Sequence, residues 1–436
     1  MPVDPNRESW KPGMGWAAAI DEIEYLRGLA AEMGGPARVE RQHSGGRYTV
    51  RERIEKMADP GSFVEMGPLV GGTEYDENGN LTHFTPGGYV MGLAELDGRP
   101  VAIGGDDFTI SGGSPHNVSK MPHDFAQPLA LQYGIPYVQL REGVGHSSKQ
   151  DEEDAFNQIK QFLSYLPNTT GDVAPRVETG DPPDRRPEEL LHIIPENRRR
   201  GYDARALIEL VVDNGGFFEM RRHYAGAVIT GFARLDGYSV GILSSDPMKL
   251  AGAMDGDGAD KYAHFVDLCD AFNLPVVIFL DMPGFMLGSV AERKATMRRG
   301  VRALIASAEA DVPKVEFNVR KSYGVAADGP NSIGLPDGIN LRFGWPAGEW
   351  GGIPIEGGVA AAYRREIADA PDPEAHRAAI EERLLRMRSP FKAAQDGDVV
   401  DLIDPRDTRR LACTFVKLAQ PALEKLARRP KRAVRP

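Results

Sequence analysis

Short apolar runs and amphipathic stretches alternate along most of this chain. Apolar or alternating runs bounded by glycine predict strands, at 89–93, 100–104, 137–140, 240–243, 276–280 and 315–319. Apolar side chains that recur at helical spacing predict helices, at 121–133, 155–166, 260–272, 297–310 and 374–388. Strands that alternate with helices in this way predict layered α/β domains.

Two of the amphipathic stretches carry more specific predictions. The first 50 residues are expected to form a helical lead-in. Before a glycine-rich breaker, they have apolar side chains roughly at helical spacing, namely Ile20, Ile23, Tyr25, Leu26 and Leu29. The helix at 297–310 is expected to turn four apolar side chains toward the core, namely those of Val301, Leu304, Ile305 and Ala308.

The chain contains an internal repeat. Residues 92–103 recur as 231–242 with seven of twelve identical, and 134–138 recur as 273–277 at the same offset of 139. Upstream, 53–66 pairs with 207–220. Three blocks in one order indicate two homologous domains. The predicted boundaries are a lead-in at 1–50, a first domain at 51–171, a Pro/Asp/Gly-rich linker at 172–200, a second domain at 201–425 and a basic tail at 426–436.

The second copy is longer than the first. After the strand at 276–280 the second copy continues through a further helix and strand, whereas the first copy reaches the helix at 155–166 soon after its equivalent strand. The first copy therefore lacks a counterpart of residues from 297 to about 354. From the sequence, loss in evolution and omission of a segment are equally consistent with this difference.

Composition narrows the class of protein. At 436 residues, 41% apolar and 26% charged, the chain has the make-up of a soluble globular protein. Its apolar runs are too short to cross a bilayer and its start is not a secretory signal, so we expect a cytoplasmic protein without membrane contact. A net charge of −11 disfavours nucleic acid as the main partner. The two cysteines, Cys269 and Cys413, are expected to be structural.

Two glycine-containing segments follow predicted strands of the second copy. Pro283 and Gly284 force a turn at the carboxyl end of the 276–280 strand, where α/β sheets place ligands. The alternative is a tight turn with Asp281 as a cap. After the 315–319 strand, Gly324 and the small residues that follow could direct backbone N–H groups at a ligand oxygen, with a helix starting near Ala326. The alternative there is a loop of small residues used for packing.

Other candidate chemistry is weaker. His146 and Ser147 are adjacent and do not readily form a dyad, and no carboxylate is placed to orient the ring. His116 and His123 lack a carboxylate or cysteine at ligand spacing, so no metal is expected. Lys249 lacks the hairpin context of a biotinyl lysine. Without a side-chain nucleophile, the segments favour stabilisation of an oxyanion by backbone amides.

These residues resemble the carboxyltransferase (beta) subunits of biotin-dependent acyl-CoA carboxylases over nearly the whole chain, from about 50 to 420. The most specific stretches are 59–65, 97–113, 231–237, 265–288 and 312–324. The resemblance implies an α/β fold of two tandem crotonase-like domains (ClpP/crotonase superfamily, ββα-superhelix), here with a truncated first domain. It also implies an active site between the first domain of one subunit and the second domain of another.

The resemblance assigns residues in the second domain. The family's Arg-Lys-Ala-Tyr-Gly-Gly-Ala-Tyr-Asp is similar to 320–328, which implies a catalytic hole at Gly324, Val325 and Ala326 for the biotin ureido oxygen. The residues expected to bind substrate are Asp328, Tyr323, Pro283, Gly284, Phe285, Gly112 and Gly113. The family's Gly-Pro-x-Ala-Gly-Gly stretch, which holds the enolate, is not found after the 137–140 strand.

The resemblance further implies the reaction and its participants. The expected activity is transfer of CO2 from carboxybiotin to the α-carbon of an acyl-CoA. Biotin would be attached to a biotin carboxylase or biotin carrier subunit, the CoA thioester would be the substrate, and no metal would take part. The chain is expected to form a homo-oligomer, a hexamer in the family. The alternatives are a decarboxylase or thioester-processing enzyme of the same fold that is independent of biotin, and a noncatalytic assembly subunit.

Overall fold

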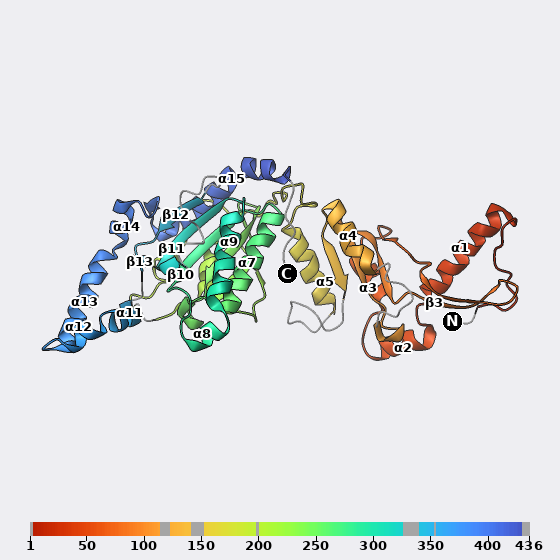
Figure 1. Cartoon of the computed structure of the whole chain (residues 1–436). Coiled ribbons are helices and arrows are strands. Elements are labelled where there is room, and N and C mark those ends of the chain that lie inside the picture. The colour runs from red at the N-terminus through yellow and green to blue at the C-terminus, as the bar shows by residue number, and fades with distance from the viewer. Residues whose placement is uncertain are drawn as a thin grey trace. The chain divides into compact units, whose positions relative to one another are not determined.

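The computed structural model describes residues 3–113, 123–140, 152–197, 200–325, 340–352 and 355–429. The chain divides into two compact units, unit 1 (Met1–Lys160) and unit 2 (Gln161–Pro436), shown in Figure 1. The domain boundaries predicted from the sequence stay predictions.

Unit 1 contains a four-stranded sheet and a separate hairpin. Its helices are α1 (Gly15–Ala31), α2 (Pro36–Ser44), α3 (Val50–Met57), α4 (His123–Tyr133) and α5 (Glu152–Ser164), which runs into unit 2. Its strands are β1 (Val64–Glu65), β2 (Gly71–Tyr75), β3 (Leu81–Pro86), β4 (Tyr89–Leu96), β5 (Arg99–Asp106) and β6 (Tyr137–Leu140), with a short helix η1 (Ser111–Gly113). The sheet order is β1-β4-β5-β6, and β2 pairs with β3.

Unit 2 is built around an eight-stranded sheet. Its helices are α6 (Ala204–Val211), α7 (Gly256–Ala271), α8 (Ser289–Arg293), α9 (Thr296–Glu309), α11 (Ile355–Ala362), α12 (Arg364–Ala368), α13 (Pro373–Met387), α14 (Pro390–Asp396) and α15 (Thr408–Ala427), with short helices η2 (Glu188–Leu191), η3 (Leu250–Gly252) and η5 (Pro405–Asp407). Its strands are β7 (Phe218–Met220), β8 (Val228–Leu235), β9 (Tyr238–Ser245), β10 (Val276–Met282), β11 (Lys314–Tyr323), β12 (Asn340–Gly344), β13 (Glu349–Gly351) and β14 (Asp401–Leu402).

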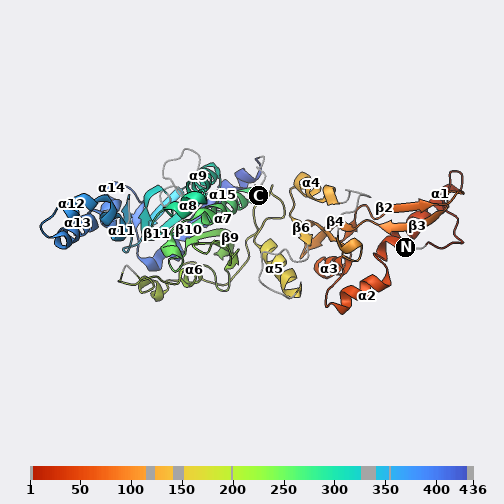
Figure 2. The same ribbon diagram turned by 60° about the horizontal axis from the view of Figure 1, so that its bottom comes forward.

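Helices cover both faces of this sheet. The strand order is β14-β12-β11-β10-β9-β8-β7, with β13 paired to the end of β11, and the pairs from β9 to β14 are parallel. α6 and α15 pack in one core with the alternate strand residues Val240, Ile242, Val277 and Phe279. α7 covers the other face so closely that a Cβ on Gly241 would lie 2.4 Å from the Cys269 sulfur. Figure 2 shows α6 on the opposite side of β9 and β10 from α7.

The two units repeat one topology. In unit 1, Tyr89 pairs with Asp106 and Ala102 pairs with Tyr137. Adding 139 to these residue numbers gives two pairs that unit 2 contains, Val228 with Ser245 and Gly241 with Val276. The glycine of each block faces an aromatic ring, since a Cβ would lie 2.7 Å from Phe63 at Gly92 and 2.7 Å from Phe217 at Gly231. The duplication predicted from the sequence is therefore confirmed strand by strand.

Within the described residues the predicted strands and helices overlap the observed ones, but the inward face predicted for α9 is wrong. α9 buries Thr296, Gly300, Ala303, Ala306 and Ser307, whereas Val301 and Ile305 are about half exposed. Small side chains face inward because α9 packs closely against α7, so the larger apolar residues remain outside. Among the described residues, no helix is long and apolar enough to cross a membrane.

Candidate active site

Three segments leave the carboxyl ends of the parallel strands β9, β10 and β11 in unit 2. They are 246–252 after β9, 281–288 at the end of β10, and 323–325 at the end of β11. Because parallel strands end at the same edge of a sheet, the three segments are neighbours, and this edge is where such sheets bind ligands.

The first segment is a strained turn held by charged groups. Asp246 Oδ1 accepts a hydrogen bond from the Met248 amide at 2.9 Å, and its Oδ2 accepts one from Arg205 Nη1 at 2.8 Å. Arg205 also donates twice to Glu219, at 2.8 and 2.6 Å. Leu250 and Ala251 have φ of 49° and 53°, a left-handed conformation that is uncommon for residues other than glycine.

The same turn occurs in unit 1, where it contains two of the predicted substrate-binding residues. Asp107 Oδ1 accepts from the Thr109 amide at 2.9 Å, and burial raises the pKa of Asp107. Ser111, Gly112 and Gly113 have φ of 50°, 66° and 73°. Their counterparts in unit 2 are Leu250, Ala251 and Gly252, which the sequence reasoning missed. The 139 offset could have found them, but alanine replaces the first glycine.

The second segment contains Pro283, Gly284 and Phe285. Gly284 has φ of 119°, and its carbonyl oxygen accepts from the Met254 amide at 3.1 Å, so the segment is bridged to Met254, two residues before α7. The Phe285 ring lies against Gly300 of α9, where a Cβ would approach to 2.6 Å. The structure therefore shows these three residues in a packed turn at the sheet edge, and their role in substrate binding stays a prediction.

Asp281 precedes this turn and is almost fully buried. Its Oδ2 accepts from Arg320 Nε at 3.1 Å and Nη2 at 2.8 Å, and its Oδ1 accepts from the Lys321 amide at 3.1 Å. Arg320 also lies over the Tyr202 ring, with 5.1 Å to the centroid. The carboxylate thus binds the neighbouring strand β11.

The third segment contains the residues expected to form the oxyanion hole. Tyr323 is buried, and its hydroxyl donates to Glu349 Oε2 at 2.5 Å. Gly324 has φ of 64°, in the left-handed region that favours glycine. Val325 does not have a positive φ, so its Cβ causes no strain of that kind. Val325 is 63% exposed. Ala326 and Asp328 lie outside the described residues, as does the helix expected near Ala326, so the hole stays a prediction.

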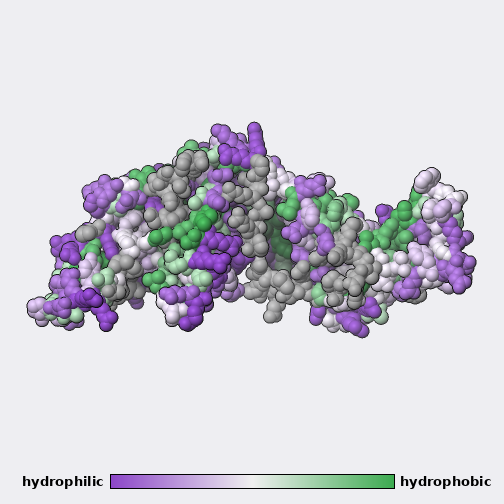
Figure 3. Space-filling model, viewed as in Figure 1, coloured by the Kyte–Doolittle hydropathy of each residue, from purple (hydrophilic) through white to green (hydrophobic). Residues whose placement is uncertain are grey.

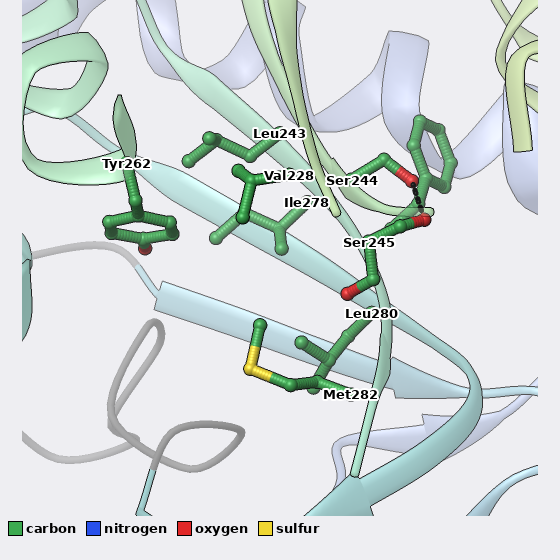
Figure 4. Close-up of a pocket in the computed structure, with 9 residues that line it drawn as sticks. Val228, Leu243, Ser244, Ser245, Tyr262, Ile278, Leu280 and Met282 are labelled. Atoms are coloured by element: carbon green, nitrogen blue, oxygen red, sulfur yellow. Dashed lines mark hydrogen bonds between the residues drawn. The ribbon is translucent and has the colours of Figure 1, made fainter. Parts of the chain in front are cut away.

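A small apolar pocket lies beside these segments (Figure 4). Its lining includes Leu243, Ser244 and Ser245 of β9, Met282 of β10 and Tyr262 of α7. Ser244 Oγ donates to the Ser245 carbonyl at 3.1 Å. Its volume of about 10 Å³ is at the lower limit for holding a single water molecule, so a ligand would have to bind outside this pocket, at the sheet edge.

Other reactive groups are few in the described part of the chain. The predicted alternatives at His116, His146 and Ser147 lie outside it. Within it, no group of three His, Cys, Asp or Glu side chains could hold a metal ion. Cys269 and Cys413 are free thiols buried in unit 2, and burial raises the pKa of both, that of Cys413 to about 12. Thiols with raised pKa are poor nucleophiles.

Comparisons with known proteins found a family, curated relatives and solved structures that are similar to this chain. The Carboxyl transferase domain family matches residues 41–147 and 129–434. The carboxyltransferase subunit of propionyl-CoA carboxylase from Haloferax mediterranei is 30% identical, over 89% of this chain and 94% of that protein. The alpha subunit of methylmalonyl-CoA decarboxylase from Veillonella parvula is 29% identical, over 90% and 94%. The transcarboxylase 12S crystal structure with methylmalonyl-CoA bound has a TM-score of 0.81 and 26% identity, over 98% of each chain.

The comparisons also bear on the shorter first copy. The alignment with the Haloferax mediterranei subunit spans 485 positions, more than the 436 residues of this chain, so that relative has residues without a counterpart here. The family match is split into two segments that overlap at residues 129–147, directly around β6. This is where the sequence predicts the first copy to be shorter. The prediction of a fold with crotonase-like domains is confirmed by the structural matches.

Proposed function

Because this chain belongs to the Carboxyl transferase domain family and is a carboxyltransferase subunit of the biotin-dependent acyl-CoA carboxylase type, we propose that it transfers a carboxyl group between carboxybiotin and the α-carbon of a short acyl-CoA. Bound carboxybiotin would supply the carboxyl group, and its freed nitrogen would accept the α-proton. No protein base is needed for that exchange, so the task of this chain is to bind and orient the reactants.

The observation that carries the proposal is the meeting of the three strand-end segments in unit 2. Gly324 is in the left-handed conformation directly after a buried strand, and Val325, which follows it, is exposed. In this proposal the amides of Val325 and Ala326 hold the ureido oxygen, and the turn at Gly112 and Gly113 contributes to acyl-CoA binding. Backbone donors of this kind are worth about 2.7–4 kcal/mol each to the reaction.

The names of the relatives suggest the substrate. They are propionyl-CoA carboxylase and methylmalonyl-CoA decarboxylase subunits, so we propose propionyl-CoA and methylmalonyl-CoA as the reacting pair. A direct test incubates the full chain with methylmalonyl-CoA and free biotin and follows propionyl-CoA by chromatography. We expect biotin-dependent formation of propionyl-CoA. Formation that is independent of biotin would identify a decarboxylase instead.

The shortened first copy is consistent with one alternative function. A noncatalytic assembly subunit would bind neither methylmalonyl-CoA nor biotin, and the division of the family match into two overlapping segments around β6 gives this alternative its basis. Calorimetric titration with each ligand separates the two cases. Absence of both binding and turnover would overturn the proposed activity.

We further propose that copies of this chain associate through an exposed apolar surface of unit 2. Met297, Val301 and Ile305 lie four residues apart on α9 and are about half exposed, beside the exposed Leu287 and Val290. Figure 3 shows apolar side chains gathered over α9. Contiguous apolar surface of this kind marks interaction sites.

Charge favours unit 1 of a second copy as the occupant. The α9 surface is flanked by Arg298 and Arg302, whereas residues 1–160 carry 24 acidic and 14 basic residues. Residues 161–436 are nearly balanced, with 39 acidic and 38 basic. Opposite charges at the rim steer association.

Sedimentation velocity at micromolar concentration tests this association. We expect Val301→Glu to shift the protein to monomer. Leu418→Glu, at a residue of α15 that is 70% exposed, is the control and should leave association unchanged. If Val301→Glu sediments like the unmodified protein, α9 is not the interface.

The cytoplasmic location expected from the sequence stays a prediction.

A further inference from the structure

A break in strand pairing lies next to the candidate site. β10 and β11 pair in register from Val276 with Lys314 to Leu280 with Asn318, and then Met282 pairs with Ser322. Between these pairs β10 advances two residues and β11 advances four, so β11 bulges at Val319–Lys321. A bulge re-aims the residues that follow it, and bulges are frequent beside active sites. Here the residues that follow are Tyr323, Gly324 and Val325.

The Asp281 carboxylate fills the space opposite this bulge. One oxygen accepts both hydrogen bonds from Arg320 and the other accepts from the Lys321 amide. The backbone of Asp281 also contacts β9 and the first segment. Its amide nitrogen donates to Ser245 Oγ at 3.4 Å, and its carbonyl oxygen is 2.4 Å from where a Cβ of Gly252 would be. A single buried residue therefore contacts the ends of β9 and β11.

Lys321 makes the complementary connection. Its Nζ donates to the Ala251 carbonyl at 3.3 Å and lies 3.9 Å from Asp281 Oδ1. Its side chain is 16% exposed, in contrast to the almost fully buried Arg320 and Asp281. Ala251 is one of the residues held in the left-handed conformation, which persists only where the surroundings fix it. The ammonium group is therefore in place to hold that turn.

We propose that Asp281 and Lys321 are positioning residues for carboxyl transfer, which hold the 246–252 turn and the 323–325 segment at a fixed separation around the biotin end of the reaction. Neither residue needs to touch a ligand. Asp281 sets the direction in which β11 leaves the sheet, and Lys321 fastens the strained turn to that strand. The inference rests on the site proposed above.

The first test measures local protection and does not depend on activity. Hydrogen–deuterium exchange by mass spectrometry compares the full chain with Lys321→Met, and with Lys417→Met as a matched control on an exposed face of α15. We expect at least about 10-fold faster exchange in peptides covering 248–252 and 322–325, since losing a fixing contact favours local opening. The rest of unit 2 should be unchanged. Equal exchange in all three proteins would overturn the proposal.

The second test separates positioning from a general loss of structure. With methylmalonyl-CoA and free biotin, Lys321→Met should lower kcat/KM for biotin about 10- to 100-fold, because small misplacements of reacting groups have effects of this size. The KM for methylmalonyl-CoA should stay the same, and Lys321→Arg should restore part of the rate. Asp281→Asn, which keeps the volume, should act in the same direction. If the unmodified protein is inactive, the proposed function has failed, and the exchange experiment still decides the positioning role. A rise in both KM values, or faster exchange throughout unit 2, would show a merely structural role.

Discussion

Replacing Arg409 should remove one of the main links between the last helix and the rest of unit 2. The guanidinium is fully buried and donates to the carbonyl oxygens of Pro182, Val211 and Asp181 at 2.9, 2.9 and 3.1 Å. It also donates to Asp213 Oδ1 at 2.8 Å. Arg409→Met keeps much of the side-chain volume but removes the hydrogen bonds that Arg409 donates to these four acceptors.

The size of the effect follows from burial. Removing one partner of a buried ion pair costs about 3–5 kcal/mol. Asp213 keeps hydrogen bonds from Thr179 and from the amides of Asp236 and Gly237, so we expect the lower part of that range. For a unit of this size the apparent Tm should fall by roughly 10 °C. The exposed neighbour provides the control, since Arg410→Met removes only a 3.4 Å contact with Asp407, and exposed pairs contribute at most about 1 kcal/mol.

Chemical denaturation followed by circular dichroism measures both variants. The double variant Arg409→Met with Asp213→Asn should lose less than the sum of the single losses, because the two residues interact directly. An Arg409→Met protein within about 1 kcal/mol of the unmodified protein would show that the reasoning from desolvation is wrong.

Further predictions concern pH, packing and the proposed site. Burial lowers the pKa of the Lys314 ammonium from 10.5 to about 8, so the unfolded chain binds more protons than the folded one between these pH values. The free energy of unfolding should therefore rise with pH through that window, by up to about 3 kcal/mol relative to Lys314→Met. A difference in denaturation between the two proteins that does not change with pH would contradict this. Gly231→Ala should destabilise unit 2, because its Cβ would lie 2.3 Å from the Phe218 carbonyl oxygen; an unchanged Tm would count against the pairing of β7 with β8. Ala326→Pro should abolish biotin-dependent transfer and leave CoA-thioester binding unchanged, and full activity in the transfer assay would mean that this loop is structural.

The repeat explains how much of the fold could be predicted. Gly92 and Gly231 are each followed four residues later by Leu-Asp-Gly, which marks the same hairpin twice, and the register of both hairpins agrees with the 139 offset. The error in predicting which face of α9 points inward has a separate cause. Periodicity shows that a helix has an apolar stripe, but the close approach of α7 selected the stripe of Gly300, Ala303 and Ser307 for the core.

The site was less predictable, because its contacts join residues far apart in the chain. Asp281 could be recognised as a residue of a turn, yet its partners Arg320 and Lys321 are brought to it by strand pairing and a bulge. No local pattern encodes that contact. Likewise, the turn of unit 2 was missed because Leu250 and Ala251 adopt a backbone conformation that sequence rules reserve for glycine.

The position of α15 bears on how the protein is made. Ala412, Cys413, Phe415 and Val416 belong to the same core as Leu190, Leu207 and Ile229, and Arg409 reaches back to Asp181 and Asp213. On the ribosome, domains generally fold in order as they emerge, and the contacts within residues 1–160 can form early. The core of unit 2 cannot close until α15 has left the exit tunnel, so this half of the protein should complete its folding later than unit 1 and should depend more on chaperones during synthesis.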